Sequence, residues 1–289
     1  MPLFGAHMSI AGGPHNALLA AQRHACETVQ MFTKSSNQWA ARPLADDEVR
    51  SFRRLLRETR LKQPVAHDAY LINLASPRPD LFQRSVDAFV VEVHRAEQLG
   101  LRYLVTHPGS HTGTDEETGL LNVVRALDEA HRRCPGFRLQ VLLETTAGQG
   151  CSLGHRFEHL AFILDRVAQP ERLGVCFDTC HVFAAGYPLA PAAAYDETMD
   201  ELNKAVGFTR VRVFHVNDSR KPLGSRVDCH AHLGRGHLGL EPFRLLVNDR
   251  RFRNRPMILE TPKEDAGGED PDRDMDAVNL ATLRGLLQK

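Results

Sequence analysis

Histidines and acidic residues recur in this sequence at the ends of short apolar segments. There are 15 histidines among 289 residues, and imidazole is both a common metal ligand and the side chain whose pKa lies closest to neutrality. Five histidines and four acids stand out: His67, His107, Glu144, Asp178, His181, His215, Asp228, His230 and Glu260. Imidazole nitrogen with carboxylate oxygen suits Zn²⁺ and, less tightly, Mn²⁺ or Fe²⁺. Since one ion uses three or four protein ligands, nine ligands imply two or three ions.

These side chains need a scaffold that gathers them. Short β-prone segments alternate with longer segments of helical periodicity, a pattern that predicts a parallel sheet flanked by helices. The expected strands are residues 4–10, 28–33, 64–70, 103–109, 138–146, 173–179, 211–218 and 256–262. The expected helices are residues 14–24, 46–60, 81–98, 115–133, 157–167, 193–206, 240–249 and 272–287. Eight such units predict an α/β fold of one domain, residues 1–289, closed as a (β/α)8 TIM barrel.

The candidate ligands lie at or just after the C-terminal ends of six successive expected strands, from the third to the eighth, with Asp228 and His230 in the loop after the seventh. In a TIM barrel the C-terminal strand ends converge on one mouth, so residues far apart in the chain become neighbours there. A single histidine at a strand end is more often a packing residue than a ligand. The occurrence of such residues at six successive strand ends favours a shared metal site, because imidazoles and carboxylates crowded together without cations would be costly to bury.

Seven segments spread over nearly the whole chain carry a family resemblance. They are GAHMSIAGG (5–13), AHDAYLINLASP (66–77), THPGSH (106–111), LLETTAGQG (142–150), GVCFDTCHVFAAGY (174–187), FHVNDSRKPLGSRVDCHAHLGRG (214–236) and LETP (259–262). In these segments the sequence resembles the endonuclease IV family. The resemblance implies a TIM barrel with three zinc ions that hydrolyses the phosphodiester 5′ to an abasic site in double-stranded DNA, leaving a 3′-hydroxyl and a 5′-deoxyribose phosphate.

The resemblance also implies how the ligands are shared. The three expected sets are His67, His107 and Glu144; Glu144, Asp178, His215 and Glu260; and His181, Asp228 and His230. Clustered divalent ions act as Lewis acids and lower the pKa of coordinated water. Glu144 and Glu260 are the candidate catalytic residues because either could orient the attacking water, and the sequence leaves open which of them, if either, accepts a proton.

Other polar residues are expected to support the ligands or to contact substrate, since metal ligands need hydrogen-bonded partners. They are His7, Asn73, His111, Gln149, Asn217, His232 and His237. Cys176, Cys180 and Cys229 lie near presumed ligands, but the resemblance assigns other residues to the metals. Cys229 stands where the family pattern has Arg, and its role stays open.

DNA contacts are expected from the loops around the mouth. Lysine plus arginine and aspartate plus glutamate both number 36, so attraction to phosphate must be local. The resemblance makes Tyr70 and Leu71 a minor-groove wedge and places Asn37 and Gln38 in a second inserting loop, where the family often has Arg instead of Asn37. The loop cations expected to meet phosphates are Lys34, Arg42, Arg220, Lys221, Arg226 and Arg235.

Composition bounds the setting of the protein. The six cysteines have no framework spacing, and the sequence has neither an apolar run of about 18 residues nor a leader at its start. We therefore expect a monomer in the cytoplasm, associated with the nucleoid and not with a membrane. The rival hypothesis is a divalent-metal sugar isomerase or epimerase on the same barrel, and the third ligand set favours the nuclease over it.

Overall fold

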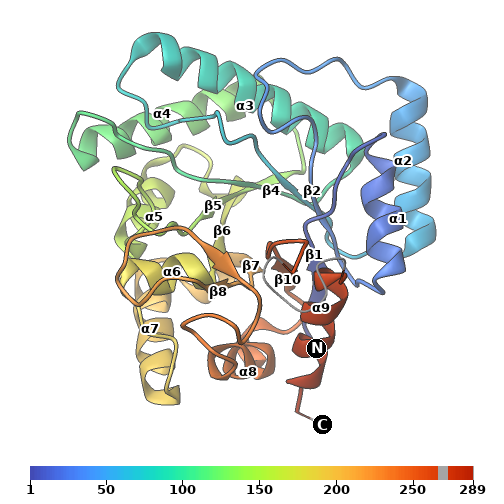
Figure 1. Cartoon of the computed structure of the whole chain (residues 1–289). Helices are drawn as coiled ribbons and strands as arrows, with labels where there is room; N and C mark the ends of the chain where they lie inside the picture. Colours follow the sequence, from blue (N-terminus) through green and yellow to red (C-terminus); the bar gives the residue numbers. More distant parts are fainter. Residues whose placement is uncertain (266–272, 289) are drawn as a thin grey trace.

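Eight parallel strands in one sheet form the centre of the molecule. The computed structural model describes residues 1–265 and 273–288. The strands lie in the order β1-β10-β7-β6-β5-β4-β3-β2. Their bounds are β1 (Leu3–Ala6), β2 (Gln30–Phe32), β3 (Val65–His67), β4 (Tyr103–Thr106), β5 (Gln140–Glu144), β6 (Leu173–Asp178), β7 (Val211–His215) and β10 (Pro256–Leu259). The two outermost strands meet at a parallel bridge between His7 and Gln30, which closes the sheet into a barrel (Figure 1).

Helices surround this barrel (Figure 1). They are α1 (His15–Arg23), α2 (Asp46–Thr59), α3 (Pro79–Leu99), α4 (Glu116–Arg133), α5 (Phe157–Arg166), α6 (Thr179–Ala185), α7 (Ala192–Ala205), α8 (Glu241–Asn248) and α9 (Met275–Gly285). The TIM-barrel prediction is therefore confirmed, with all eight expected strands and helices present in order. Residue 272, the expected start of the last helix, lies outside the described residues.

Two features were not expected from the sequence. Helix α6 follows β6 without a loop and has only seven residues, too few to show a helical period. The loop after β7 also contains a two-residue antiparallel ladder, β8 (Asp218–Ser219) with β9 (His230–Ala231). Both additions lie at the C-terminal side of the barrel, where they carry candidate ligands.

Local signals explain where several helices begin and end. The Asp115 side chain accepts a hydrogen bond of 2.7 Å from the Thr118 backbone N–H, which caps the first turn of α4. Gly100 ends α3 with φ of 75°, a left-handed conformation that glycine adopts without steric cost. Aspartate at the start of a helix and glycine at its end are the residue types that favour these conformations, so propensity and tertiary structure agree at these positions.

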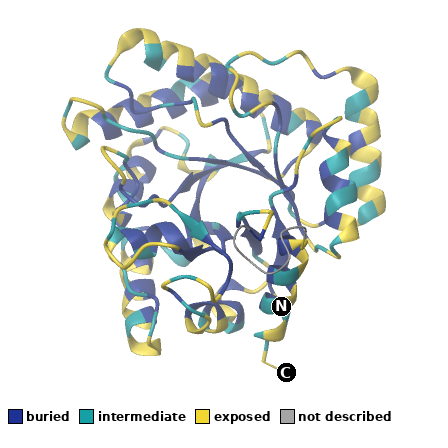
Figure 2. Cartoon of the chain, viewed as in Figure 1, coloured by how far each residue is buried: buried dark blue, intermediate teal, exposed yellow. Residues whose placement is uncertain are grey.

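The core has two parts. A small cluster fills the barrel interior with side chains from six strands, namely Val65, Tyr103, Val105, Leu142, Cys176, Val213 and Ile258. A larger cluster lies between the strands and the helices, so the strands are dark in Figure 2 while the outward helix faces are exposed. Filling of the interior means that a site can form only at an end of the barrel. Among the described residues, no helix is both long enough and apolar enough to cross a membrane.

The helix-to-sheet layer can be tested at Phe89 of α3, which is 0% exposed. Phe89→Ala removes a fully buried ring, and we expect a loss of roughly 3 to 5 kcal/mol in the free energy of unfolding, measured by urea denaturation. Val91 lies on the same helix and is 39% exposed, so Val91→Ala should change this free energy by no more than about 0.5 kcal/mol. Equal losses in the two variants would contradict the packing described here.

Candidate metal centre

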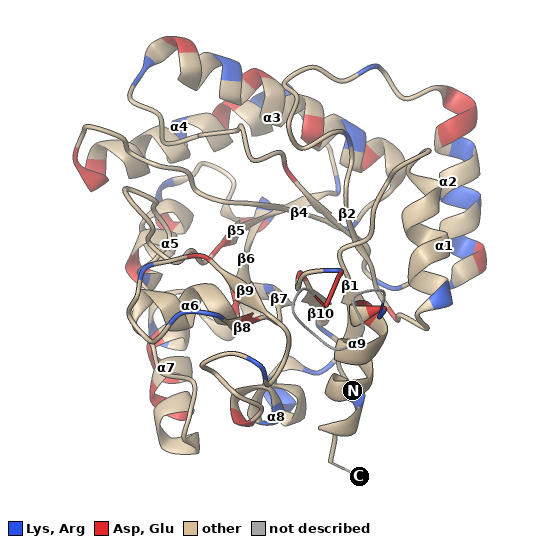
Figure 3. Ribbon diagram, in the orientation of Figure 1, with Lys and Arg blue, Asp and Glu red and all other residues tan. Residues whose placement is uncertain are grey.

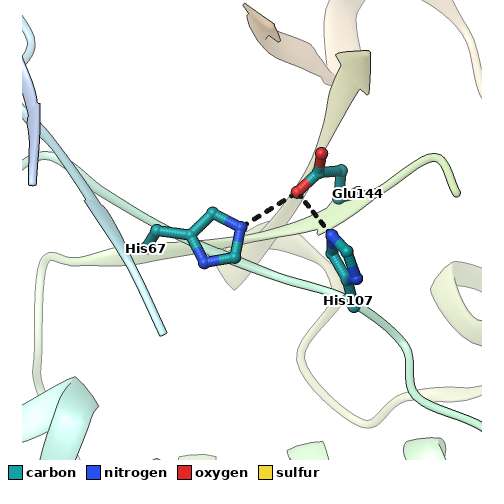
Figure 4. Close-up of side chains that lie close together, drawn as sticks. All are labelled: His67, His107 and Glu144. Atoms are coloured by element: carbon teal, nitrogen blue, oxygen red, sulfur yellow. Dashed lines mark hydrogen bonds and ion pairs between the residues drawn. The ribbon is translucent and has the colours of Figure 1, made fainter. Parts of the chain in front are cut away.

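A buried carboxylate occupies the middle of the barrel mouth. Glu144 is the last residue of β5 and is 1% exposed. Its Oε2 lies 3.1 Å from Nε2 of His67 and 3.2 Å from Nε2 of His107 (Figure 4). Its Oε1 lies 2.9 Å from Nδ1 of His215 and 3.3 Å from Nδ1 of His181. The ends of three strands and one helix thus deliver imidazoles to one carboxylate.

Two of the expected ligand sets recur as tight groups of donor atoms. His67, His107 and Glu144 have ligand atoms within 4.8 Å of one another, and so do Glu144, Asp178, His215 and Glu260. Glu144 belongs to both groups, as the expected sharing of ligands requires. In Figure 3 the acidic segments near β5, β8 and β10 lie in the middle of the barrel.

The third expected set is assembled by the loop additions. His181 Nε2 lies 3.1 Å from Asp228 Oδ2, His230 Nε2 lies 3.4 Å from Asp228 Oδ1, and the two Nε2 atoms are 3.4 Å apart. Asp178 and Cys180 are also close to His230. The Cys180 thiol donates to the Cys229 carbonyl over 3.7 Å, and burial, followed by the charge of Asp178, raises its pKa to about 12. The protonated thiol makes Cys180 a weaker candidate than Asp228.

Hydrogen bonds fix which nitrogen each histidine presents. Carbonyl oxygens only accept hydrogen bonds, so a ring nitrogen facing one must carry a proton. Four rings are held this way: His67 Nδ1 donates to Asp68 O (2.9 Å), His181 Nδ1 to Thr145 O (2.9 Å), His230 Nδ1 to Glu260 O (3.2 Å) and His215 Nε2 to Gln30 Oε1 (2.8 Å). The other nitrogen of each neutral ring then directs a lone pair at a carboxylate. Two facing lone pairs repel, so the arrangement fits a cation between them.

The electrostatics of the mouth lead to the same conclusion. Burial lowers the pKa of His67, but the hydrogen bond and charge of Glu144 outweigh burial and raise this pKa to about 10. Burial likewise opposes, and Glu260 and Glu144 then raise, the pKa of His215. For Glu144 burial favours the neutral acid, yet the charges of His215 and His107 hold its pKa well below the usual range. The ionised carboxylates therefore need positive charge close by. Without metal the protonated imidazoles provide it, and divalent ions would provide it in place of those protons.

Further contacts hold the ligands in place. Asp178 caps α6 by accepting from the His181 backbone N–H over 2.9 Å, so one ligand orients the helix that carries another. Asn217 Nδ2 donates to Asp178 Oδ2 over 2.8 Å, and Gln149 Oε1 accepts from the Asp228 backbone N–H over 3.0 Å. Both were expected to play supporting roles.

Of the histidines expected to support ligands, His7 contacts one, whereas the hydrogen bonds of His111, His232 and His237 go to other residues. His7 Nδ1 lies 3.3 Å from Glu260 Oε1. His111 hydrogen-bonds to Thr114, and His232 to Asn279 and Glu264. The His237 backbone donates to Ser219, and Asn73 joins Ser110 to Ala75.

Gln30, which contacts His215 and Glu260, was missed because glutamine in a strand is not a ligand type and nothing in its neighbourhood marks it.

A second group of ligand-type residues lies away from this centre. Glu116, His155 and His159 also have donor atoms within 4.8 Å of one another. However, Gly154 N–H and Arg156 Nε–H point at the two ring nitrogens of His159, and Arg156 Nη2 pairs with Glu116 over 2.6 Å. Burial, then His155 and Arg156, lower the pKa of His159 to about 4. These positive neighbours disfavour a further cation, so we assign no metal to this group.

The residues expected to contact DNA surround the mouth. Tyr70 is 69% exposed, and its ring packs edge-on against Phe32 with centroids 5.5 Å apart. Asn37, Gln38 and Arg226 are exposed, while Leu71 is partly buried. A cavity of about 240 Å³ opens beside His67 and His107 and reaches Tyr70 and Ser110.

The structure corrects the expectation for one of the loop cations, Lys34. Lys34 is buried, with Nζ 3.4 Å from Glu92 Oε1 and hydrogen-bonded to the Gln38 carbonyl, so it anchors its loop from within. Arg42 forms a bidentate pair with Glu48, and Arg235 pairs with Asp265 over 2.6 Å. Both arginines are nevertheless exposed, as are Arg220, Lys221 and Arg226.

Similarity to known proteins gives this arrangement a family. A family model described as "Xylose isomerase-like TIM barrel" matches residues 18–281. "Probable endonuclease 4" of Chloroflexus aurantiacus is 49% identical over 288 residues, covering 100% of this chain and 99% of the relative. The chain belongs to the endonuclease IV family. The solved structure of endonuclease IV from Thermus thermophilus is 36% identical, with a TM-score of 0.86 and coverage of 99% of this chain and 98% of that one.

The rival sugar-enzyme hypothesis is supported by the fold alone. A solved structure of a D-tagatose 3-epimerase-like protein aligns with a TM-score of 0.71 over 98% of this chain and 96% of the other, but with 17% identity. At that identity the likeness concerns the barrel and not the chemistry at its mouth.

Metal content tests the assignment of ligands. We expect plasma emission on the purified protein to find two to three equivalents of divalent metal. Glu144→Ala should lose more than one equivalent, because this carboxylate belongs to two of the three sets. Glu116→Ala is the matched control and should keep the full content. One equivalent or none in the unmodified protein would contradict the assignment.

Proposed function

We propose that this protein is a DNA repair endonuclease that hydrolyses the phosphodiester 5′ to abasic sites in double-stranded DNA, leaving 3′-hydroxyl and 5′-deoxyribose phosphate ends. The observation that carries the proposal is the convergence of nine imidazole and carboxylate groups at one barrel mouth, in a chain of the endonuclease IV family. Because one chain supplies the whole donor set, we propose that it acts as a monomer.

Three zinc ions are the proposed occupants, with Mn²⁺ or Fe²⁺ as substitutes, because each set combines imidazole nitrogen with carboxylate oxygen. Their holders are the three sets described above. When bound, the ions supply Lewis acidity at the phosphate and lower the pKa of coordinated water. They also add six positive charges against the four carboxylates of the sets, which gives a protein of zero formal net charge a local attraction for DNA.

The two candidate catalytic carboxylates differ in what they can do. Both oxygens of Glu144 face imidazoles, and its side chain is 1% exposed, so we assign it to holding ligands. Glu260 lies at the end of β10 with its side chain 17% exposed, and its Oε2 lies 3.1 Å from His215. We therefore assign Glu260 to orienting the attacking water at the mouth.

Lesion recognition is assigned to the exposed side chains beside the cavity. A nucleotide without its base leaves the helical stack at low cost, and a side chain inserted in its place stabilises the opened duplex. Tyr70, whose ring packs edge-on against Phe32, is proposed to act as this wedge together with Leu71. Asn37 and Gln38 are proposed to enter from the loop after β2, with Arg226 on a phosphate, and the cavity beside His67 is proposed to receive the extruded deoxyribose.

The direct test is incubation with end-labelled duplex that contains one abasic site, beside the same duplex intact. We expect a single cut 5′ to the lesion with a 3′-hydroxyl end, loss of cutting in a strong chelator, and restoration by added zinc. Glu144→Ala should reduce cutting to background because the sets lose their shared ligand. Cutting that persists in chelator, or that ignores the abasic site, would refute the proposal.

Tyr70 can be tested separately from the chemistry. We expect Tyr70→Ala to reduce the ratio of affinities for abasic and intact duplex about tenfold or more, as loss of one stacking side chain costs ~1 to 3 kcal/mol. Tyr70→Phe keeps the ring and should preserve most of this ratio. Both affinities are measured by fluorescence anisotropy in the absence of turnover. An unchanged ratio in Tyr70→Ala would leave this residue without a role in recognition.

A further inference from the structure

Gln30 lies at the seam where the barrel closes. It is the first residue of β2, its side chain is buried, and its backbone forms the bridge to His7 that joins β2 to β1. The next strand beyond β1 is β10, which ends beside Glu260. Closure of the barrel therefore places the Gln30 amide beside candidate ligands from two strands, Glu260 after β10 and His215 at the end of β7.

The orientation of the Gln30 amide follows from its neighbours. Its Nε2 donates to Glu260 Oε1, and an ionised carboxylate can only accept hydrogen bonds. The same Nε2 lies 3.0 Å from His7 Nδ1. The amide oxygen must then face His215, where it lies 2.8 Å from Nε2. His215 is consequently protonated on Nε2 and presents the Nδ1 lone pair to Glu144 and Glu260.

We propose that Gln30 is a positioning residue for the metal centre: its amide selects the Nδ1 atom of His215 as the coordinating nitrogen and fixes the carboxylate of Glu260 beside it. The inference rests on the proposed function, since it concerns the second set of ligands. Gln30 would contact neither the substrate nor the ions, because glutamine is not among the ligand types of this site. It would act only through His215 and Glu260.

His215 differs in this respect from the other oriented histidines. His67, His181 and His230 donate to backbone carbonyls, which no substitution removes. The orientation of His215 depends on a single side chain. Because His215 is fully buried, water has no free access to replace the lost acceptor. Loss of the Gln30 amide should therefore weaken one set of ligands and spare the others.

The experiment compares Gln30→Met with Gln140→Met in the full-length, metal-loaded protein. Methionine has nearly the length of glutamine but cannot reproduce its hydrogen bonds. Gln140 is the matched control, because it is the first residue of β5 and its amide donates to the Glu171 and Leu173 carbonyls, at the opposite end of the barrel. Each protein is dialysed against a graded series of chelator concentrations, and retained zinc is measured by plasma emission alongside the unfolding midpoint.

We expect Gln30→Met to lose about one zinc equivalent at a roughly 10- to 100-fold lower chelator concentration than the unmodified protein. The remaining zinc should follow the unmodified curve, and Gln140→Met should follow that curve throughout. If Gln30→Met does not fold, Gln30→Asn keeps an amide in the strand but shortens it by one methylene, and the same loss of zinc is expected.

Three results are distinguishable. Retention of all zinc by Gln30→Met at the unmodified chelator midpoint would overturn the inference while leaving the proposed function intact. Equal zinc loss from Gln30→Met and Gln140→Met would also overturn it, since general destabilisation would then be the cause. Absence of any divalent metal from the unmodified protein would remove the proposed function itself.

Discussion

The buried Glu144 carboxylate faces four imidazole nitrogens, and the rest of the mouth depends on this contact. A buried carboxylate is stable only when compensating charge is close and hydrogen bonds are complete. The nearby carboxylates of Asp178 and Glu260 increase this demand. Neutral imidazole rings without a cation would therefore leave the carboxylates of the site uncompensated. Proton or metal must fill the space between the donors, and divalent ions match both the charge and the mixture of nitrogen and oxygen.

The barrel satisfies this demand with groups that cannot easily rearrange. Backbone carbonyls at residues 68, 145 and 260 set the protonated nitrogen of three histidines. The short helix α6 is capped by Asp178, so its first turn presents His181 to the same carboxylate that β7 reaches with His215. Such preorganisation lowers the reorganisation needed when ions bind, because the ligands already have the required tautomer and direction. His215 is the exception, oriented by a glutamine that barrel closure brings across the seam.

The periphery of the mouth shows how loops are held without contributing ligands. The loop after β2 is anchored from beneath by Lys34, which pairs with Glu92 of α3, and by Arg95, whose guanidinium donates to the Thr33 and Arg42 carbonyls. These buried contacts leave the tip, with Asn37 and Gln38, exposed. Asp218 acts similarly after β7, where it accepts backbone N–H groups from Gly234, Gly236 and Leu238. A loop that is anchored where it leaves the barrel but exposed at its tip can contact a large ligand without moving the candidate metal ligands.

The sequence by itself determined the succession of strands and helices and the nine candidate ligands, because periodicity is local and ligands are recognisable by type at or after six of the eight strand ends. It did not predict α6 or the β8–β9 ladder, which are too short to carry a period, nor the burial of Lys34, whose partner Glu92 lies on another element. Only the tertiary structure decided which nitrogen each ring presents, which carboxylate reaches solvent and that Gln30 faces His215. These depend on hydrogen-bonding distances between residues far apart in the chain, which closure of the barrel sets and local sequence does not encode.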